Sequence, residues 1–511
     1  MSTLVARLRG HAASQGDRPA LTYLGAGGAP ESALTFAALD ERVRGVAAAL
    51  QARTQPGDRA VLLFSPGLDY AVAFLACLYA GVVAVPVYLP RGDRQLPRLQ
   101  TVLDDATPVL ALTNHATLAR CGPALRAAIP TTLLLEDALA PDAWVDDRSA
   151  PLAFLQYTSG STGAPRGVRI SHANLMHNSQ AIYDAFGHGP DSVALLWVPP
   201  YHDMGLIGGI LQPVFGGFHG VLMSPLAFLK HPLGWLRAVE RYGATTSGGP
   251  NFAYELCATK APAVQGLDLS RWQLAFNGAE PVRAGTLERF ADAFAPFGFR
   301  KEAFFPCYGL AEGTLIVSGG RPRTLAVDAA ALERHEVAPG TDRLLVSAGH
   351  VTGNQRVTIE GGMVGEICVE GPSIAAGYWG QPDRVGPLRT GDLGFLHEGE
   401  LFVTGRLKDL IIVDGRNFYP QDLEATAERV ATVRPGGAAA FGVAGQDGER
   451  VVLMLEAAGS EVGGEVRRAI AAEHEVELAD VVLVPAGGLP RTSSGKVRRG
   501  ACREAYAAAR A

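Results

Sequence analysis

Lysine is scarce in this sequence. The 45 basic residues include only Lys230, Lys260, Lys301, Lys408 and Lys496, and all the others are arginines. Lysine is a compact charge on a flexible stem, and arginine does not replace it freely. A lysine inside a motif of this sequence therefore indicates a position where the chemistry requires it.

Cysteine pairs and long apolar runs are also missing. The six cysteines are scattered and form no pair with metal-ligand spacing, which is typical of a reduced cytoplasmic protein. No apolar run has the length of a membrane span, and residues 1–9 lack the apolar core of a signal peptide. The net charge of −6 argues against a general affinity for nucleic acid or anionic membranes. We therefore expect a cytoplasmic protein without a membrane span.

The order of apolar segments predicts an α/β protein with two domains. Apolar strands alternate with amphipathic helices over residues 1–405, which favours mainly parallel sheets. Helices are predicted at 69–80, 234–241, 284–294, 421–430 and 465–475. Short strands with tight turns follow from about Gly361, and a small α+β unit begins near Lys408. We predict a large N-terminal domain over 1–406, including a small β-barrel-like subdomain, and a small mobile C-terminal domain over 407–511.

One loop, Tyr157–Val168, combines five hydroxyls, three glycines and one cation. The apolar run Leu152–Leu155 precedes it as a buried strand would, and Ser171 follows as a helix N-cap. This succession is typical of a polyphosphate site, because glycines let backbone N–H groups approach phosphate oxygens. The P-loop spacing is absent, since no Gly-Lys-Ser/Thr closes the loop. The alternative is a flexible Gly/Ser linker, which a strand and a capped helix make less favoured.

Five further segments carry polar chemistry, although each has an ordinary structural interpretation. His202-Asp203 follows two prolines and precedes a glycine-rich helix, where it is a catalytic pair or a cap. Phe276–Pro281 follows a strand and is either an ordinary turn or a contact to a purine. In Pro306–Thr314, Tyr308 can stack on a base and Glu312 can bind Mg²⁺ beside phosphates, and the alternative is a structural role. A carboxylate suited to ribose hydroxyls is present in a fourth segment, which has two pieces, Arg389–Gly394 and Gly405–Asp409. The alternative is a plain turn between strands. Leu489–Arg499 contains Lys496 in a loop, or is a basic solvated tail.

In this order, the segments resemble the adenylate-forming superfamily of acyl-CoA synthetases, peptide-synthetase adenylation domains and luciferases. The resemblance covers nearly the whole chain. It is strongest to the fatty acyl-AMP ligases, and the matching segments are Tyr201–Gly208, Gly248–Tyr254, Asn277–Pro281, Cys307–Glu312 and Gly415–Asp422. The resemblance implies that a fatty acid attacks the α-phosphorus of ATP, that pyrophosphate leaves, and that the acyl group then passes to the phosphopantetheine thiol of an acyl carrier protein. The carrier is expected in trans.

The resemblance also implies a role for each matching residue. The ATP phosphates are expected at Thr158, Ser159, Gly160, Ser161, Thr162 and Gly163. Adenine is expected at Asn277, Gly278, Ala279, Glu280, Tyr308 and Gly309. The ribose is expected at Asp392 and Arg406, and Mg²⁺ at Glu312. The catalytic group is expected to be Lys496, which reaches the α-phosphate and the attacking carboxylate, with His202 at the carboxylate end of the acyl site. The acyl tunnel is expected along Ile207, Gly208, Ile210 and Leu211. Lys408 is expected at the hinge between domains.

Two features bear on which member of the superfamily this is. The stretch 319–342 matches an insertion of acyl-AMP ligases, thought to hinder the domain motion that admits coenzyme A, and its docking side is expected from Leu325, Val327, Ala330, Leu332 and Val337. The alternative is an ordinary surface excursion. Arg166 stands where the family loop usually has lysine, so the charge for phosphate binding is retained. The competing functions are an acyl-CoA synthetase and an inactive acyl- or nucleotide-binding homologue.

Overall fold

The computed structural model describes residues 3–25, 27–90, 92, 95–158, 165–413, 416–430, 432–445, 448–459, 461–491 and 496–510. The predicted phosphate contacts Ser159, Gly160, Ser161, Thr162 and Gly163 lie outside these ranges. Within them, no helix combines the length and apolar character needed to cross a membrane. All six cysteine positions are described, and all six thiols are free.

The N-terminal part contains a six-stranded sheet with strand order β6-β5-β3-β4-β7-β8. The strands are β3 (Arg59–Leu62), β4 (Val83–Pro86), β5 (Leu110–Thr113), β6 (Thr132–Leu134), β7 (Leu152–Thr158) and β8 (Arg166–Ser171). All pairs are parallel except β7–β8. The accompanying helices are α2 (Phe36–Gln51), α3 (Leu68–Ala80), α4 (Leu96–Ala106), α5 (His115–Arg120) and α6 (Pro123–Ala128). Twelve of the 13 residues of α3 are buried, as expected for a helix that is apolar on all sides.

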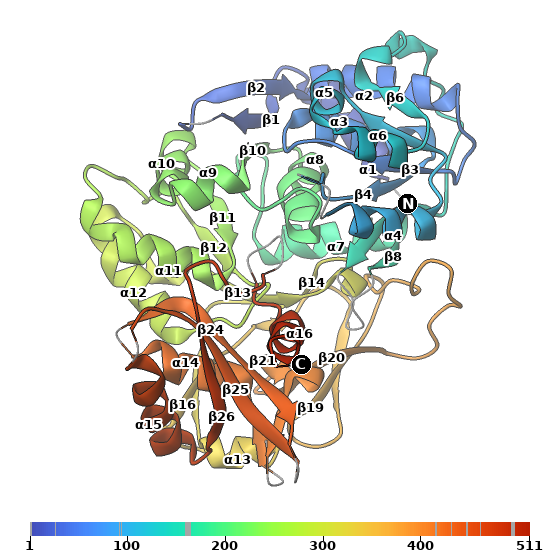
Figure 1. Ribbon diagram of the computed structural model, residues 1–511. Coiled ribbons are helices and arrows are strands. Elements are labelled where there is room, and N and C mark those ends of the chain that lie inside the picture. Colours follow the sequence, from blue (N-terminus) through green and yellow to red (C-terminus); the bar gives the residue numbers. More distant parts are fainter. Residues whose placement is uncertain are drawn as a thin grey trace.

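A second sheet of 13 strands runs through the middle of the molecule (Figure 1). Its parallel part is β1 (Pro19–Leu24), β10 (His219–Met223), β9 (Val193–Leu196), β11 (Thr246–Gly249), β12 (Leu274–Asn277) and β13 (Phe304–Gly309), with β2 (Pro30–Thr35) antiparallel at the edge. Its antiparallel part is β14 (Ile316–Gly319), β17 (His350–Val351), β21 (Glu400–Arg406), β20 (Leu388–His397), β19 (Gly365–Glu370) and β18 (Arg356–Glu360). The predicted β-subdomain is thus continuous with the parallel sheet through β13 and β14.

Helices associated with this second sheet carry much of the core. They are α1 (Leu4–Gln15), α7 (His172–Ala185), α8 (Gln212–Gly216), α9 (Pro225–Lys230), α10 (Leu233–Tyr242), α11 (Asn251–Lys260) and α12 (Ala284–Phe294). The core contains a large aromatic cluster in which Phe290 packs on Tyr254, Trp272 and Phe304 with ring centroids 5.1–6.2 Å apart. The predicted helices 234–241 and 284–294 correspond to α10 and α12.

The C-terminal part has a sheet of its own with strand order β24-β25-β26. Its elements are β22 (Ile411–Val413), β23 (Arg416–Phe418), α14 (Pro420–Glu428), β24 (Val433–Ala444), β25 (Glu449–Ala457), α15 (Val462–His474), β26 (Leu478–Val484) and α16 (Arg499–Ala508). Alternate residues of β24 and β25 face two separate apolar clusters, one with α14 and α15 and the other with α16. This separate core agrees with the α/β plus α+β class that the sequence predicts.

The connection after the glycine-rich loop differs from the prediction. Strand β8 lies between the loop and the helix, because buried Val168 and Ile170 let this segment pair with β7. The helix start itself is confirmed: Ser171 caps α7, and its hydroxyl accepts a hydrogen bond from Asn174 N at 3.0 Å.

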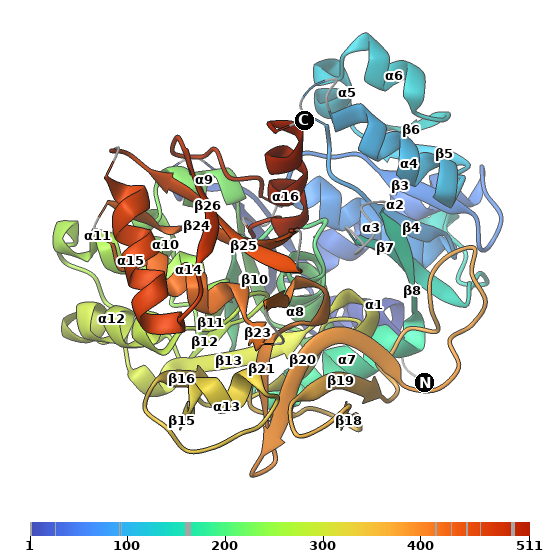
Figure 2. The same ribbon diagram turned by 60° about the horizontal axis from the view of Figure 1, so that its bottom comes forward.

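The stretch 319–342 folds into β15 (Thr324–Val327) and α13 (Ala329–Glu333), and β15 pairs with β16 (Arg343–Val346). Leu325, Val327, Leu332 and Val337 pack with side chains of β20, β21 and Tyr419. Ala330, expected on this side, is exposed, and its neighbour Ala331 is buried instead, because the helix turns Ala330 outward. Figure 2 shows α13 and β16 beside β20 and β21.

Candidate active site

The described residues on either side of the predicted phosphate loop belong to one hairpin, and the cation that follows the loop contacts an aromatic side chain. Thr158 and Arg166 face each other at the end of β7 and the start of β8. The Arg166 guanidinium lies 4.0 Å from the ring centroid of Tyr378 and donates to its hydroxyl at 3.2 Å. That hydroxyl donates to Glu312 Oε1 at 2.7 Å. Tyr378 therefore connects the cation of the loop to the predicted metal ligand, a role that sequence reasoning missed.

The predicted adenine residues are positioned by the parallel strands β12 and β13. Both strands end at one edge of the sheet, so Asn277–Glu280 lies beside Tyr308 and Gly309. Ala279 has a φ of +70°, unusual for a residue with a side chain. A Cβ on Gly278 would lie 2.7 Å from Cys307 Sγ, so glycine permits the close approach of the two segments. The Asn277 amide is buried, and its Oδ1 has no partner among the described residues.

The predicted ribose residues meet on neighbouring strands. Asp392 of β20 is opposite Arg406 of β21, and Oδ1 lies 3.0 Å from Arg406 Nε. Tyr308 donates its hydroxyl to Asp392 Oδ2 at 2.7 Å. Burial and the charge of Asp392 raise the pKa of Tyr308, so this hydroxyl remains a donor.

The predicted acyl-tunnel residues lie on a π-helix. Ile207, Gly208, Ile210 and Leu211 belong to the π-helix Met204–Leu211, and only Gly208 is partly exposed among these four. Gly205 in the same helix has no room for a side chain, because its Cβ would lie 2.0 Å from Pro199 O. Short π segments are frequent at functional sites.

Beside this helix, His202 Nδ1 lies 2.6 Å from Asp203 Oδ1. Burial of Asp203 opposes its ionisation, but His202 and Lys496 outweigh that effect and lower the pKa of this carboxyl. Asp203 also accepts from Met204 N at 2.6 Å, so it both caps the helix and pairs with the histidine.

Lys496 enters this group from the C-terminal part. Burial lowers the pKa of its ammonium, as does the charge of Arg406, while the carboxylates of Asp203, Glu280 and Asp392 act in the opposite direction. Burial raises the pKa of Glu280, against the effects of Phe252 N and the charge of Lys496. The charge of one lysine is thus coupled to Asp203 beside His202, to Glu280 of the predicted adenine segment and to Asp392 of the predicted ribose pair.

The turn between β21 and β22, where the two predicted domains join, makes a contact that the sequence did not predict. Lys408 is exposed in a 3₁₀ turn, Leu407–Asp409, between β21 and β22. Arg499, three residues after Lys496, binds Asp409 Oδ2 at 3.3 Å and Glu424 Oε2 at 2.6 Å. It therefore links the turn to α14 and to the segment that carries Lys496.

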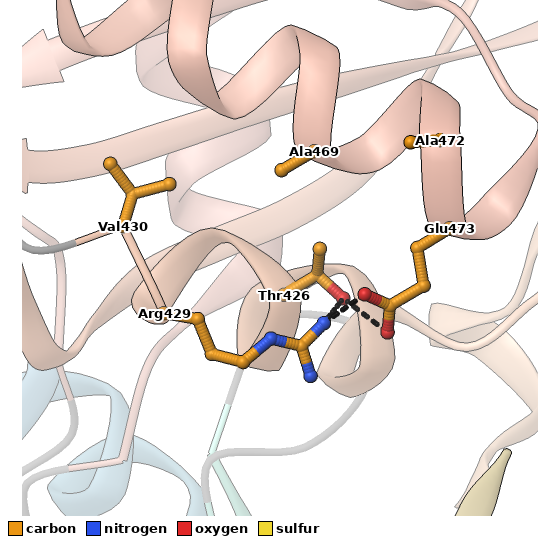
Figure 3. Close-up of a pocket in the computed structure, with 6 residues that line it drawn as sticks. All are labelled: Thr426, Arg429, Val430, Ala469, Ala472 and Glu473. Carbon is orange, nitrogen blue, oxygen red and sulfur yellow. Dashed lines mark hydrogen bonds and ion pairs between the residues drawn. The ribbon is translucent and has the colours of Figure 1, made fainter.

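Figure 3 shows a separate surface groove of about 520 Å³ between α14 and α15. Its charged residues, Arg429 and Glu473, pair with each other, and Thr426 Oγ1 donates to Glu473 at 3.1 Å. None of the predicted site residues lines this groove.

Comparison with known proteins identifies the family. Residues 8–379 match the AMP-binding enzyme family. The chain is 41% identical to the medium-chain-fatty-acid–[acyl-carrier-protein] ligase JamA of Moorena producens, over 98% of this chain and 94% of the relative. It is 36% identical to the long-chain-fatty-acid–AMP ligase FadD32 of Mycolicibacterium smegmatis, over 99% and 94% of the two chains. A fatty acyl-adenylate ligase structure from Legionella pneumophila, with acyl adenylate and pyrophosphate, superposes with a TM-score of 0.77 at 39% identity, over 99% and 96%.

The chain therefore belongs to the AMP-binding, adenylate-forming enzymes and, among these, to the fatty acyl-AMP ligases. This family is ATP-dependent, and the α/β fold class predicted from the sequence is confirmed.

Proposed function

We propose that this protein joins a fatty acid to AMP and then passes the acyl group to the thiol of an acyl carrier protein. The observation that carries the first step is the burial of Lys496 at a place where the charges of Asp203, Glu280, Asp392 and Arg406 all act on its ammonium. A carboxylate oxygen bonds to the α-phosphorus while the bond to the bridging oxygen breaks, and pyrophosphate leaves with that electron pair. Both reactants are anions, so positioning and charge neutralisation supply most of the catalysis.

The residues of the site would divide this work. The Lys496 ammonium would lie between the entering carboxylate and the α-phosphate, where it offsets the repulsion of the two anions. The Asp392–Arg406 pair would hold the ribose, and the Asn277–Glu280 segment with Tyr308 would hold adenine. His202, oriented by Asp203, would line the carboxylate end of the acyl site. Thr158 would contribute to the phosphate loop.

Glu312 fits the predicted Mg²⁺ site. Its carboxylate is partly exposed and is oriented by Tyr378 through Oε1. Among the described residues, no group of three or more acidic, histidine or cysteine side chains is arranged for a metal. One carboxylate suits Mg²⁺, which commonly takes its other ligands from substrate phosphates and water. The ion would neutralise phosphate charge.

Contacts of the inserted stretch favour a carrier protein over coenzyme A as acceptor. Glu333 Oε2 lies 2.9 Å from Arg416 Nε, and Asn417 Nδ2 donates to Glu333 O at 2.7 Å. These bonds join 319–342 to the proposed C-terminal domain 407–511, and they oppose a rotation of that domain about the proposed hinge at Lys408. JamA is named as an acyl-carrier-protein ligase, whereas another relative, FadD21 of Mycobacterium tuberculosis, is named a putative fatty-acid–CoA ligase.

The test is fatty-acid-dependent exchange of pyrophosphate into ATP across a panel of chain lengths. We expect exchange by the wild type, loss of exchange in Lys496→Ala, and unchanged ATP binding by calorimetry. Lys260→Ala, at an exposed lysine of α11, is the matched control and should behave as wild type. Near-normal exchange in Lys496→Ala would refute the assignment of this lysine, and no exchange with any acid would favour an inactive homologue. Rapid thioester formation with free coenzyme A would favour an acyl-CoA synthetase.

A further inference from the structure

A buried carboxylate, Glu456, lies beneath the segment that carries Lys496. It stands near the end of β25 and is 2% exposed. A charge in such a position is costly unless other groups compensate it. Two of the groups that compensate the charge of Glu456 come from the segment Leu489–Arg499, which carries Lys496.

Two of the groups around Glu456 belong to the chain just before Lys496. Leu489 N donates to Glu456 Oε1 at 3.3 Å, and Arg491 Nη2 lies 3.6 Å from the same oxygen. On the other side, Arg434 Nη1 lies 3.4 Å from Oε2. Leu489 is 3% exposed and packs in the cluster beneath α16, so this end of the segment is anchored by both charge and burial.

The chain just after Lys496 is joined to the same anchor. Arg498 N donates to Pro490 O at 2.9 Å, and Val497 forms an antiparallel bridge with Arg491. Lys496 is therefore one residue from Val497, which pairs directly with an arginine held by Glu456. The charge of Arg491 also favours the ionised carboxyl of Glu280, which follows β12, and acts there with the charge of Lys496.

We infer that Glu456 is a positioning residue for acid activation: it anchors Leu489 and Arg491, and the pairing of Arg491 with Val497 passes this anchor to Lys496 and so fixes the ammonium in the site. The inference rests on the proposed role of Lys496. A displacement of about 1 Å at a reacting group costs up to about a hundredfold in rate. Loss of this anchor should therefore lower the rate of acyl-AMP formation without removing any group that touches ATP.

The test substitution is Glu456→Gln, which keeps the size and one acceptor oxygen but removes the charge. We expect kcat for acid-dependent pyrophosphate release to fall about ten- to hundredfold, with KM for ATP and its calorimetric affinity unchanged. Glu449→Gln is the matched control. Glu449 is the first residue of β25, and its carboxylate accepts a hydrogen bond from Ile412 N at 2.7 Å, but no contact among the described residues joins it to the segment Leu489–Arg499 that carries Lys496.

A second measurement is independent of activity. With so few lysines in the chain, endoproteinase Lys-C resolves cleavage after Lys496 from cleavage after Lys408. Glu456→Gln should accelerate the first cut and leave the second unchanged. If Glu456→Gln fails to fold, Arg491→Gln removes the same link while the carboxylate keeps Arg434 and Leu489 N.

The outcomes separate the two claims. A kcat within twofold of wild type, or equal acceleration of both cuts, would overturn the role of Glu456. If Lys496→Ala itself exchanges pyrophosphate normally, the proposed function of the lysine fails, whatever Glu456→Gln does.

Discussion

Replacing Arg343 by methionine tests how firmly the C-terminal part is held against the two-stranded sheet of β15 and β16. Arg343 of β16 binds Asp422 of α14 with an N–O distance of 2.8 Å, and the two side chains are 12% and 28% exposed. Its guanidinium also lies 4.8 Å from the ring centroid of Tyr419 and donates to Thr404 O at 3.4 Å. Methionine retains most of the apolar stem but removes all three interactions.

The expected cost follows from this burial. Breaking a fully buried pair costs about 3–5 kcal/mol, and an exposed pair about 0–1 kcal/mol. Burial already raises the pKa of Asp422 to about 6 in the presence of Arg343, so without its partner this carboxyl takes up a proton, which limits the loss. We expect the free energy that holds the C-terminal part in place to fall by about 2–3 kcal/mol, which is equivalent to about a 30- to 150-fold increase in the population in which this part is undocked.

Cleavage by endoproteinase Lys-C after Lys408 is the assay. The turn that contains Lys408 lies between β21 and β22, and cleavage of a transiently opened form follows its population when opening is fast. Arg334→Met is the matched control, because the Arg334–Glu336 pair is 62% and 61% exposed and should contribute little. Equal cleavage rates for Arg343→Met, Arg334→Met and wild type would refute the reasoning.

Three further predictions address the site and the core. Burial lowers the pKa of Lys496, so acyl-AMP formation should decline with rising pH before an exposed lysine titrates near about 10.4, and a plateau to that pH would contradict it. The folded pKa of Asp422, about 6, exceeds its unfolded value of about 3.9, so its contribution to stability is present at low pH and lost as pH rises between them. The Tm advantage of wild type over Asp422→Asn should shrink from pH 4 to pH 7, and a constant difference would count against it. Phe290→Ala removes a fully buried ring and should lower the free energy of unfolding, measured in urea, by about 3–5 kcal/mol. A loss under about 1 kcal/mol would contradict this prediction and would show that the core collapses around the smaller side chain.

Local patterns predicted the elements with strong periodicity. The helix 284–294 is α12 to the residue, and 234–241 lies within α10. Ser171 was identifiable as a cap because its hydroxyl serves the backbone next to it in sequence. The sequence did not predict the short strand β8, because its residues directly follow the glycine-rich loop and form a strand only by pairing with β7. The sequence predicts a helix after Asp203 but not the π-helical geometry of Met204–Leu211, since apolar residues there cover every face.

The site divides in a similar way. Asp392 and Arg406 lie in separate motifs, and only the register of β20 against β21 sets them 3.0 Å apart. Tyr378 and Glu456 carry no motif of their own, because what distinguishes them is the partner each meets across the fold. No local signal identifies such residues, whose roles depend on contacts made by distant parts of the chain.

By itself the sequence determined the class of fold and the order of the chemical segments, because each depends on residue type and near-neighbour spacing, and its resemblance to the adenylate-forming enzymes led us to expect Lys496 as the catalytic lysine. Only the tertiary structure decided which of those groups meet. Lys496 lies far from Asp203 and Glu280 in the chain, and packing of the C-terminal part buries it where their charges act on its ammonium. Electrostatic interaction and burial depend on distance in space, which the linear order of residues does not specify.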